Sequence, residues 1–414
     1  MSLKGDIDQQ ACDILLANDQ GGYTIPTEGL YPHQWNWDSA MAALGFAEFD
    51  VNRAWLELET LFSAQWPNGM VPHIIFHKPS EDYFPGPDTW GGNQGTIPSS
   101  GISQPPLAST MARFIHEKDP VLGKQKLKIL FPKMLAWHKW FVAWRGFKGA
   151  IMTTHPWESG RDNAPDWDAL MASIEPVGLL PYTRKDTSMV ESSMRPKKFD
   201  YDRYLHLVAI GKKSAWNEWE LKDLNPFRIA DPGLTFTVLR AARDLQYLGD
   251  VLGYDTSTLK KDLPAMEEGL KYIWNAEEAY FDARNTRTHE FSKSLTNASF
   301  LNWYAGHHSE EMLLKLRDQI SMVPYGVASY DPRSSKFDRE RYWRGPSWAV
   351  VNFLIGKGLE EMNHPEGAEL RGRTREMILK GGFSEYFDPI TGEPKGGQSF
   401  TWTAVVWLVW AGKD

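Results

Sequence analysis

Residues 52–73 read NRAWLELETLFSAQWPNGMVPH, and this stretch shows the pattern on which the fold prediction rests. In its first part Trp55, Leu58, Leu61 and Phe62 recur at helical spacing, which predicts an amphipathic helix over residues 52–65. The Pro-Asn-Gly that follows is a strong turn signal. The stretch is therefore a helix that runs into a long loop carrying aromatic and polar side chains.

The same alternation of helix and long loop continues along the chain. Nine further helices are predicted, over residues 107–117, 122–144 with an interruption near Pro132, 202–221, 234–252, 257–275, 309–320, 347–362, 366–380 and 400–411. Alternating strand patterns are scarce, and no linker rich in Ser, Pro or charge marks a domain boundary. Because the long loops recur about every second helix, we expect helical hairpins in a ring with the loops gathered at one end. The prediction is one all-α domain over residues 1–414, an (α/α) toroid of roughly ten to twelve helices.

Composition and charge exclude several classes of partner. The 414 residues are 42% hydrophobic and 24% charged, which is ordinary for a globular protein. A net charge of −8 without a block of Lys or Arg argues against nucleic acid and anionic membranes. The single cysteine, Cys12, excludes an internal disulfide and a multi-cysteine metal site. Residues 1–6 lack an apolar signal core and no run of 18 apolar residues occurs, so a cytoplasmic location is expected by default.

A second stretch, HPWESGRDNAPDWD at residues 155–168, has the composition of a sugar-cleaving site. It places Glu158, Asp162, Asp166 and Asp168 among two tryptophans and several turn formers, so it is predicted to be a loop. Indole rings stack on pyranose rings, and a sheltered carboxyl keeps its proton near neutral pH and acts as an acid. The alternative is an acidic surface loop whose tryptophans only pack.

The stretch YPHQWNWD at residues 31–38 carries similar residue types. Trp35 and Trp37 offer a stacking surface, and Asp38 offers a carboxylate that accepts hydrogen bonds from sugar hydroxyls. The alternative is that Asp38 or Ser39 caps the next helix while the tryptophans pack.

Two later loops add an arginine and a further carboxylate. In RYWRGPSW at residues 341–348, Arg344 either holds a carboxylate in a bidentate fork or is solvated. In GFSEYFDP at residues 382–389, Glu385 is either a second catalytic carboxylate or a surface residue at a helix end.

Other chemistries lack their motifs. The histidines are scattered, with no HExxH and no close pair on one helix, so no metal site is expected. GxSxG is absent and GGNQG at residues 91–95 is not followed by Lys-Ser/Thr, so neither serine hydrolysis nor a phosphate-binding loop is indicated. No cofactor is expected.

These loops, in this order, resemble glycoside hydrolase family 63, and within it a bacterial branch of mannosylglycerate and glucosylglycerate hydrolases. The resemblance is carried by YPHQWNWDSA (31–40), QWPNGMVPH (65–73), HPWESGRDN (155–163), RYWRGPSW (341–348), GFSEYFDPITGEPKGG (382–397) and FTW (400–402). It spans nearly the whole chain, and QWPNG is also similar to a trehalase element. The resemblance implies an (α/α)6 toroid that cleaves α-linked glucosides or mannosides with inversion, with a small-molecule glycoside as its partner.

The resemblance also implies roles for single residues. Asp162 matches the general acid of the family, and Glu385 matches its general base. The positions that match substrate-binding ones are Tyr31, Trp35, Trp37, Asp38, Gln104, Trp157, Gly160, Arg161, Tyr204, Tyr342, Trp343, Gly345 and Trp348. Candidates for binding the glycerate are Tyr201, Arg203 and Tyr204, and Lys198 stands where some relatives have Arg.

On this assignment Asp162 protonates the glycosidic oxygen while Glu385 deprotonates a water on the opposite face of the sugar. Inversion requires roughly 6.5–9.5 Å between the two carboxyls, which leaves room for that water. We expect the tryptophans and the other carboxylates of residues 155–168 to raise the pKa of Asp162.

Two other functions fit the same residues. One keeps hydrolysis and changes the substrate to another α-glucosyl disaccharide or oligosaccharide. The other is a sugar epimerase or a non-catalytic sugar-binding protein on the same scaffold, for which His33, His73 and His155 are the candidates. The residues leave open whether glucose or mannose is bound and whether the chain forms a homo-oligomer.

Overall fold

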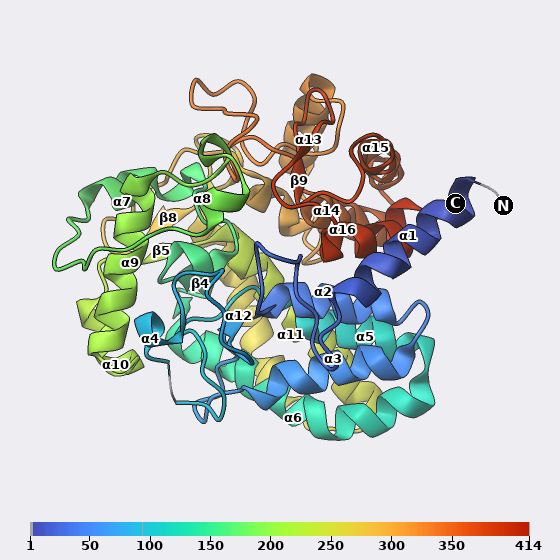
Figure 1. Cartoon of the computed structure of the whole chain (residues 1–414), viewed down its shortest axis with the longest axis horizontal. Helices are drawn as coiled ribbons and strands as arrows, with labels where there is room; N and C mark the ends of the chain where they lie inside the picture. Colours follow the sequence, from blue (N-terminus) through green and yellow to red (C-terminus); the bar gives the residue numbers. More distant parts are fainter. Residues whose placement is uncertain (1–2, 93, 414) are drawn as a thin grey trace.

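Two concentric rings of helices build the computed structural model, which describes residues 3–92 and 94–413. Figure 1 shows the whole chain, with its first helix (blue) beside its last helix (red). The inner ring consists of α2 (Asn36–Phe46), α5 (Leu107–Lys118), α11 (Pro232–Leu252), the 3-10 helix η4 (Asn297–Asn302), α14 (Ala349–Glu361) and α16 (Thr401–Val406). Each inner helix packs on the next, and α16 packs on α2, so the ring is closed. The outer ring consists of α1 (Leu3–Asn18), α3 (Val51–Ser63), α6 (Pro120–Trp144), α12 (Ser257–Ile273), α13 (Glu310–Met322) and α15 (Pro365–Gly381). This is the predicted all-α (α/α)6 toroid. Asn93 of the GGNQG stretch and the ends of the predicted 1–414 domain lie outside the described residues.

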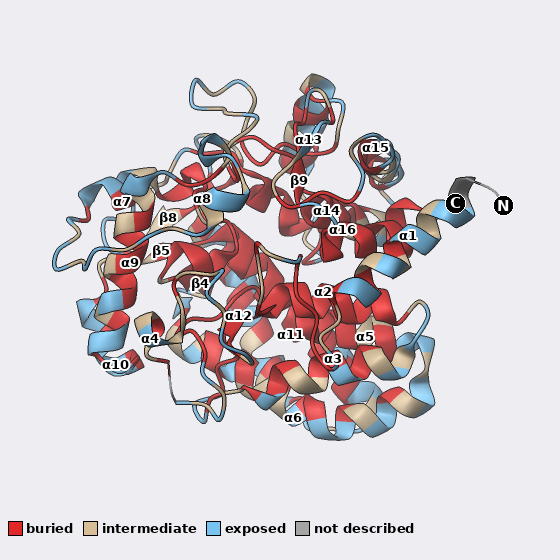
Figure 2. Ribbon diagram, in the orientation of Figure 1, coloured by how far each residue is buried: buried red, intermediate tan, exposed pale blue. Residues whose placement is uncertain are grey.

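Burial follows the two rings. Every residue of α2 and α16 is buried, because both helices touch neighbours on all sides. The outer helix α3 is buried mainly along one stripe that contains Trp55, Leu58, Leu61 and Phe62, as its spacing predicted. Figure 2 shows the same contrast between the central helices and the outer surfaces of α6 and α15.

The connections from outer to inner helices are long, and those from inner to outer helices are short. The long connections are residues 19–35, 64–106, 145–231, 274–296, 323–348 and 382–400. By contrast, α2 and α3 are joined by residues 47–50, and α14 and α15 by residues 362–364. Since every hairpin has its long connection at the same end, these loops gather over one end of the ring, as the rhythm of the sequence predicted.

One predicted helix, over residues 202–221, is two helices in the structure. These are α9 (Lys198–Lys213) and α10 (Glu218–Leu224). Between them Ala215 and Trp216 have positive φ angles of 50° and 57°. The turn places the Trp216 indole against Gly211 and lets its N–H donate to the carbonyl of Trp90 at 2.8 Å. A long-range contact therefore ends this helix, and the local sequence carries no sign of it.

Two other local predictions are corrected. The interruption expected near Pro132 is absent, because α6 runs through this residue. The proline removes one helical hydrogen bond, and burial of Phe131 and Met134 on either side holds the helix together. Asp38 and Ser39 do not cap a helix, because α2 begins at Asn36 and both residues lie in its first turn.

Short elements complete the long connections. The strands are β1 (Gln34–Trp35), β2 (Ile74–Ile75), β3 (Gly146–Phe147), β4 (Ala150–Thr153), β5 (Ile229–Ala230), β6 (Trp274–Asn275), β7 (Tyr280–Phe281), β8 (Arg284–Asn285), β9 (Tyr386–Phe387) and β10 (Pro394–Lys395). They pair antiparallel as β1-β2, β6-β7, β9-β10 and the four-stranded sheet β3-β4-β5-β8. The short helices are α4 (Pro87–Trp90), α7 (Asp168–Ser173), α8 (Asp186–Met189), the 3-10 turns η1 (Pro156–Ser159), η2 (Pro165–Trp167) and η3 (Ser192–Met194), and the π-helical turn η5 (Trp407–Ala411). The helices α1, α4, α7, α8 and the inner-ring 3-10 helix η4 have no counterpart among the sequence predictions, and α2 was indicated only as the helix that Asp38 or Ser39 would cap.

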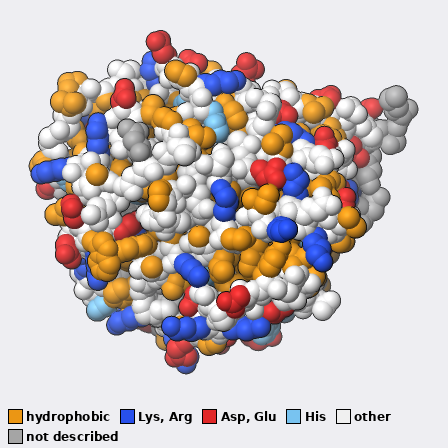
Figure 3. Space-filling model, turned by 90° about the horizontal axis from the view of Figure 1, so that it is seen from below, with side chains coloured by type: hydrophobic (Ala, Val, Ile, Leu, Met, Phe, Trp, Pro, Cys, Tyr) orange, Lys and Arg blue, Asp and Glu red, His pale blue; other side chains and the backbone are white. Residues whose placement is uncertain are grey.

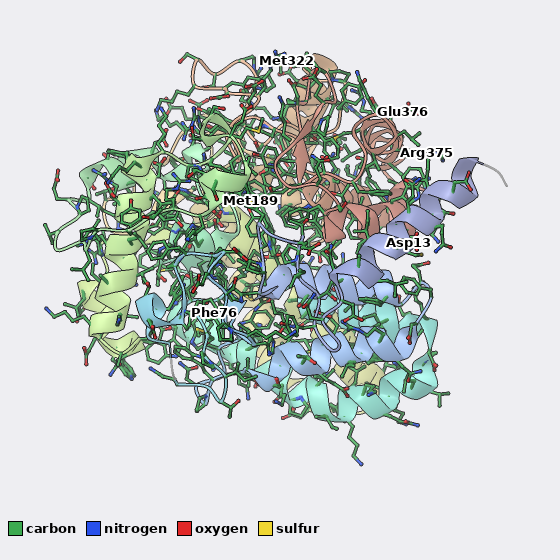
Figure 4. All side chains as sticks on the ribbon, in the orientation of Figure 1. Asp13, Phe76, Met189, Met322, Arg375 and Glu376 are labelled. Carbon is green, nitrogen blue, oxygen red and sulfur yellow. The ribbon has the colours of Figure 1, made fainter. Side chains whose placement is uncertain are left out.

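The outer surface carries charges of both signs. Acidic and basic side chains are interspersed over the face shown in Figure 3. Figure 4 places Asp13 on α1 and Arg375 on α15, whereas Phe76 and Met189 belong to the long connections. None of the helices among the described residues has the length and apolar character needed to cross a membrane.

Candidate active site

A pocket lies where the long connections meet. It encloses about 710 Å³ including its open mouth. Its walls come from five of the long connections and from α2 and α16. Ten predicted site residues line it: Tyr31, Trp35, Trp37, Asp38, Gln104, Trp157, Gly160, Asp162, Tyr342 and Glu385.

Asp162 reaches the pocket from the connection between α6 and α11. Its carboxyl touches the cavity and is otherwise surrounded by protein, and this burial raises its pKa from 3.8 to about 7. The guanidinium of Arg195 opposes the rise, whereas the negative charges of Glu385 and Asp186 add to it. A carboxyl with this pKa keeps its proton in a large fraction of molecules at neutral pH, as a general acid requires.

The three other carboxylates of residues 155–168 are held by arginines. Glu158 pairs with Arg145 at 2.9 Å, Asp166 with Arg161 at 3.0 Å and Asp168 with Arg344 at 2.8 Å. In the described part of the chain the fourth carboxyl, that of Asp162, has no such ion pair. The three neighbours were expected to raise the pKa of Asp162 if they lie near it, and they are not among its main causes, which are burial and the charges of Arg195, Glu385 and Asp186.

Glu385 reaches the pocket from the connection between α15 and α16, directly before β9. Its side chain accepts a hydrogen bond on each oxygen, from the Tyr31 hydroxyl at 2.8 Å and from the Gly397 amide at 2.9 Å. The Arg195 guanidinium lies 3.6 Å from the first of these oxygens. Gly396 has a φ of +70°, and a Cβ on it would come within 2.4 Å of the carboxylate. The carboxylate is therefore fixed in one orientation.

The two carboxyl groups belong to connections that lead into opposite helices of the inner ring. The loop of Asp162 leads into α11, and the loop of Glu385 leads into α16. In the closed order α2, α5, α11, η4, α14, α16 these two helices are three places apart, which is the far side of a ring of six. Two separate connections thus bring a carboxyl group each to one pocket.

The start of α2 supplies a second wall of the pocket. The β1-β2 pair brings Trp35 to the rim, and the main-chain N–H of Trp37 donates to the side-chain oxygen of Gln104 at 3.3 Å. Asp38 is buried in the first turn of α2, and burial together with the charge of Glu385 raises its pKa well above the usual range. Aromatic faces and hydrogen-bonding groups thus stand side by side, as a sugar requires.

Five predicted binding residues lie behind the pocket wall. The guanidinium of Arg161 is turned away into two buried ion pairs. The Tyr204 hydroxyl donates to a main-chain carbonyl, and Gly345 donates its N–H to a serine hydroxyl. The rings of Trp343 and Trp348 stack on each other at 3.7 Å. These residues support the walls and do not line the cavity.

Arg195 lines the pocket and was not among the predicted residues. Its Nε donates to Asp186 at 3.2 Å, and its guanidinium lies 4.2 Å from the centre of the Tyr342 ring. Its Nη1 is buried and has no hydrogen-bond partner among the described residues. The neighbouring sequence, SSMRPKK, carries no signal for such a role, because the partners of Arg195 come from other segments.

The candidates for binding glycerate divide into two groups. Tyr201 lines the pocket, beside Tyr83 and Phe84, which the sequence also did not indicate. Lys198 instead forms an exposed ion pair with an aspartate of its own helix, and Arg203 donates to main-chain carbonyls. Arg344 was predicted either to bind a carboxylate or to be solvated. It donates two hydrogen bonds, one to each carboxylate oxygen of Asp168, both at 2.8 Å.

The histidines proposed for an epimerase do not form a common site. Among the three, His73 alone lines the pocket. Burial lowers the pKa of His155 to about 3 and that of His33 to about 4, and it lowers the pKa of His73 well below its usual range. All three rings are therefore neutral at physiological pH.

Comparison with known proteins agrees with this architecture. Residues 31–403 match the family described as "Mannosylglycerate hydrolase MGH1-like glycoside hydrolase domain". The chain is 41% identical to mannosylglycerate hydrolase MGH1 of Selaginella moellendorffii, covering 97% of this chain and 85% of that protein. It is 32% identical to glucosylglycerate hydrolase of Mycolicibacterium hassiacum, covering 97% of each. The crystal structure of a GH63 mannosylglycerate hydrolase from Thermus thermophilus in complex with Tris and D-glycerate superposes with a TM-score of 0.93, at 37% identity over 97% of this chain and 99% of that one. The predicted resemblance to glycoside hydrolase family 63 is confirmed: the chain belongs to the mannosylglycerate hydrolase MGH1-like family and is a glycoside hydrolase.

Proposed function

We propose that this enzyme hydrolyses α-mannosylglycerate, α-glucosylglycerate or both to the free sugar and glycerate, with inversion at the anomeric carbon. The presence of Arg195 in the pocket is the observation that supports glycerate as the aglycone. Among the described residues that line the pocket it is the only Lys or Arg, and its buried Nη1 has no hydrogen-bond partner, with its ion-pair partner Glu385 at 3.6 Å. A carboxylate is the natural partner for such a group. The names of the relatives support the same two substrates.

In the proposed reaction Asp162 is the general acid. Its carboxyl proton passes to the glycosidic oxygen as the bond between this oxygen and the anomeric carbon breaks. Glycerate then leaves as an alcohol, and Asp162 becomes ionised. The pKa of about 7 supports this role, because the group holds its proton at neutral pH and is still acidic enough to release it.

Glu385 is the proposed general base. A water molecule attacks the anomeric carbon from the side opposite to glycerate and gives its proton to Glu385, so the β-anomer of the sugar is released. The hydrogen bond from Tyr31 and the amide of Gly397 hold the carboxylate toward that water. We expect the carboxyl groups of Asp162 and Glu385 to stand roughly 6.5–9.5 Å apart, as in other inverting glycosidases.

The pocket walls suggest where each part of the substrate lies. The sugar ring fits against Trp35 and Trp37, with Asp38 and Gln104 accepting or donating hydrogen bonds to its hydroxyls. The glycerate carboxylate fits toward Arg195. We further propose that the chain forms one catalytic domain, which one hydrophobic core cluster running from Ala11 to Ala411 supports. Action in the cytoplasm and the state of assembly stay predictions.

The proposal is tested by measuring release of sugar from α-mannosylglycerate, α-glucosylglycerate, trehalose and a malto-oligosaccharide. We expect turnover of at least one glycerate conjugate and no comparable turnover of the others. Cleavage of trehalose or the malto-oligosaccharide alone would overturn the assignment of the aglycone. Asp162→Asn keeps the shape of the acid and removes its proton, so kcat is expected to fall at least about 10²-fold.

A further inference from the structure

The main-chain carbonyl of Asp162 accepts two side-chain hydrogen bonds. The indole N–H of Trp167 donates to it at 2.9 Å, and the hydroxyl of Tyr204 donates to it at 2.8 Å. Both donors are buried, and they come from different places, one from the same loop and one from α9. Two donors on a single loop carbonyl fix the orientation of the peptide group from which the side chain of Asp162 extends.

The next residue along the loop is held from a third direction. The carbonyl of Asn163 accepts a hydrogen bond from Arg344 at 3.2 Å, and its side-chain oxygen accepts one from the main-chain N–H of Trp343 at 3.0 Å. Arg344 in turn grips both oxygens of Asp168 at 2.8 Å. The RYWRGPSW stretch thus contacts the loop of Asp162 directly, and its Arg344 holds a carboxylate in a bidentate fork, one of the two alternatives that the sequence offered.

A second cavity lies behind this arrangement. It encloses about 1000 Å³ including open solvent, and its lining includes Asn163, Trp167, Tyr204 and Arg344. Part of the loop therefore borders open space on the side that faces away from the active-site pocket, while Asn163, Trp167 and Tyr204 themselves are buried. The hydrogen bonds tie the loop to α9 and to the RYWRGPSW stretch on this side.

From this geometry we propose that Tyr204 and Trp167 are positioning residues for the general acid, and that they act through the main-chain carbonyl of Asp162. The inference rests on the proposed function of Asp162. An aspartate has a short side chain, so the place of its carboxyl is set mainly by the main chain. A displacement of about 1 Å from the glycosidic oxygen costs roughly 10²-fold in rate. Neither residue is needed to bind the sugar, because neither lines the active-site pocket.

The test compares two substrates that differ in their need for an acid. In α-mannosylglycerate the leaving group is an alkoxide and must receive a proton from Asp162. In α-mannosyl fluoride the C–F bond breaks to give fluoride, a much weaker base that leaves without a proton. The attacking water still gives its proton to Glu385. Loss of acid positioning therefore slows the first substrate and spares the second.

For Tyr204→Phe we expect kcat on α-mannosylglycerate to fall about 10- to 100-fold, with KM changed by less than about threefold. Turnover of the fluoride should stay within about threefold of wild type. Equal losses on both substrates, a change confined to KM, or no loss on either would overturn the proposal. Trp167→Phe removes the second donor and is expected to show the same pattern, which keeps the proposal testable if one variant folds poorly.

Tyr272→Phe is the matched control. It removes a tyrosine hydroxyl that hydrogen-bonds His289 at 2.8 Å in an exposed position, so both substrates should be turned over at the wild-type rate. Failure of the proposed function has a different signature: the wild-type enzyme itself would then leave both α-mannosylglycerate and α-glucosylglycerate intact, whatever the variants do. If the wild-type enzyme cleaves only the glucoside, α-glucosylglycerate and α-glucosyl fluoride replace the mannosyl pair in this test.

Discussion

Replacing Arg195 with methionine removes the guanidinium from the pocket and keeps a side chain of similar length. The Nε of Arg195 donates to Asp186 at 3.2 Å, while its buried Nη1 forms an ion pair with Glu385 at 3.6 Å and has no hydrogen-bond partner among the described residues. The aglycone carboxylate therefore gains one charge-assisted hydrogen bond, which contributes about 1.5–3 kcal/mol. At about 1.4 kcal/mol per tenfold change, Arg195→Met should lower kcat/KM for α-mannosylglycerate about 10- to 150-fold.

The variant also changes the surroundings of Glu385 and Asp162. A second substrate is therefore needed to separate the loss of binding to the glycerate carboxylate from these other effects. In α-mannosylglycerol a hydroxymethyl group replaces the carboxylate, and everything else is the same. The predicted quantity is the ratio of the two losses in kcat/KM, measured by release of mannose. A ratio near one, with both substrates affected equally, would refute the role of Arg195 in binding the aglycone.

Three further predictions concern the loop of the acid. Because burial raises the pKa of Asp162 to about 7, kcat/KM should fall as the pH rises above that value and the acid loses its proton; a flat pH profile up to about pH 9 would contradict this. Glu158→Gln weakens a buried pair with Arg145, which keeps Glu218 as its second partner, so the free energy of unfolding should fall by about 1–3 kcal/mol in a denaturant titration. Gly160→Ala places a Cβ 2.7 Å from the indole ring of Trp37 at a residue with a φ of +71°, so the free energy of unfolding should fall by about 1–3 kcal/mol in the same assay. An unchanged free energy of unfolding would contradict this strain.

The architecture was predictable because local sequence patterns indicate most of its helices and the starts of its long connections. Helical spacing of apolar residues, as in residues 52–65, marks the outer helices, and turn signals such as Pro-Asn-Gly mark where long connections begin. Their alternation indicates the ring without any long-range information. The break between α9 and α10 was not predictable in this way, because Trp216 leaves the helix to contact Trp90, a residue more than a hundred positions away.

The site was predictable in part for a similar reason. Asp162, Glu385 and the tryptophans of residues 31–38 stand in loops whose composition is unusual, and the structure brings them to one pocket. The direction of a side chain is not visible in the sequence. Arg161 stands beside the proposed acid yet turns into buried ion pairs, whereas Arg195, in an unremarked polar stretch, faces the cavity.

Proton NMR of the wild-type enzyme distinguishes inverting from retaining cleavage of a glycosylglycerate. The enzyme is mixed with α-mannosylglycerate or α-glucosylglycerate, and the anomeric signals are followed before the released sugar equilibrates. We expect the β-anomer to appear first, together with free glycerate. First appearance of the α-anomer would contradict the assignment of Glu385 as a base acting through water, and intact substrate would contradict the proposed function itself.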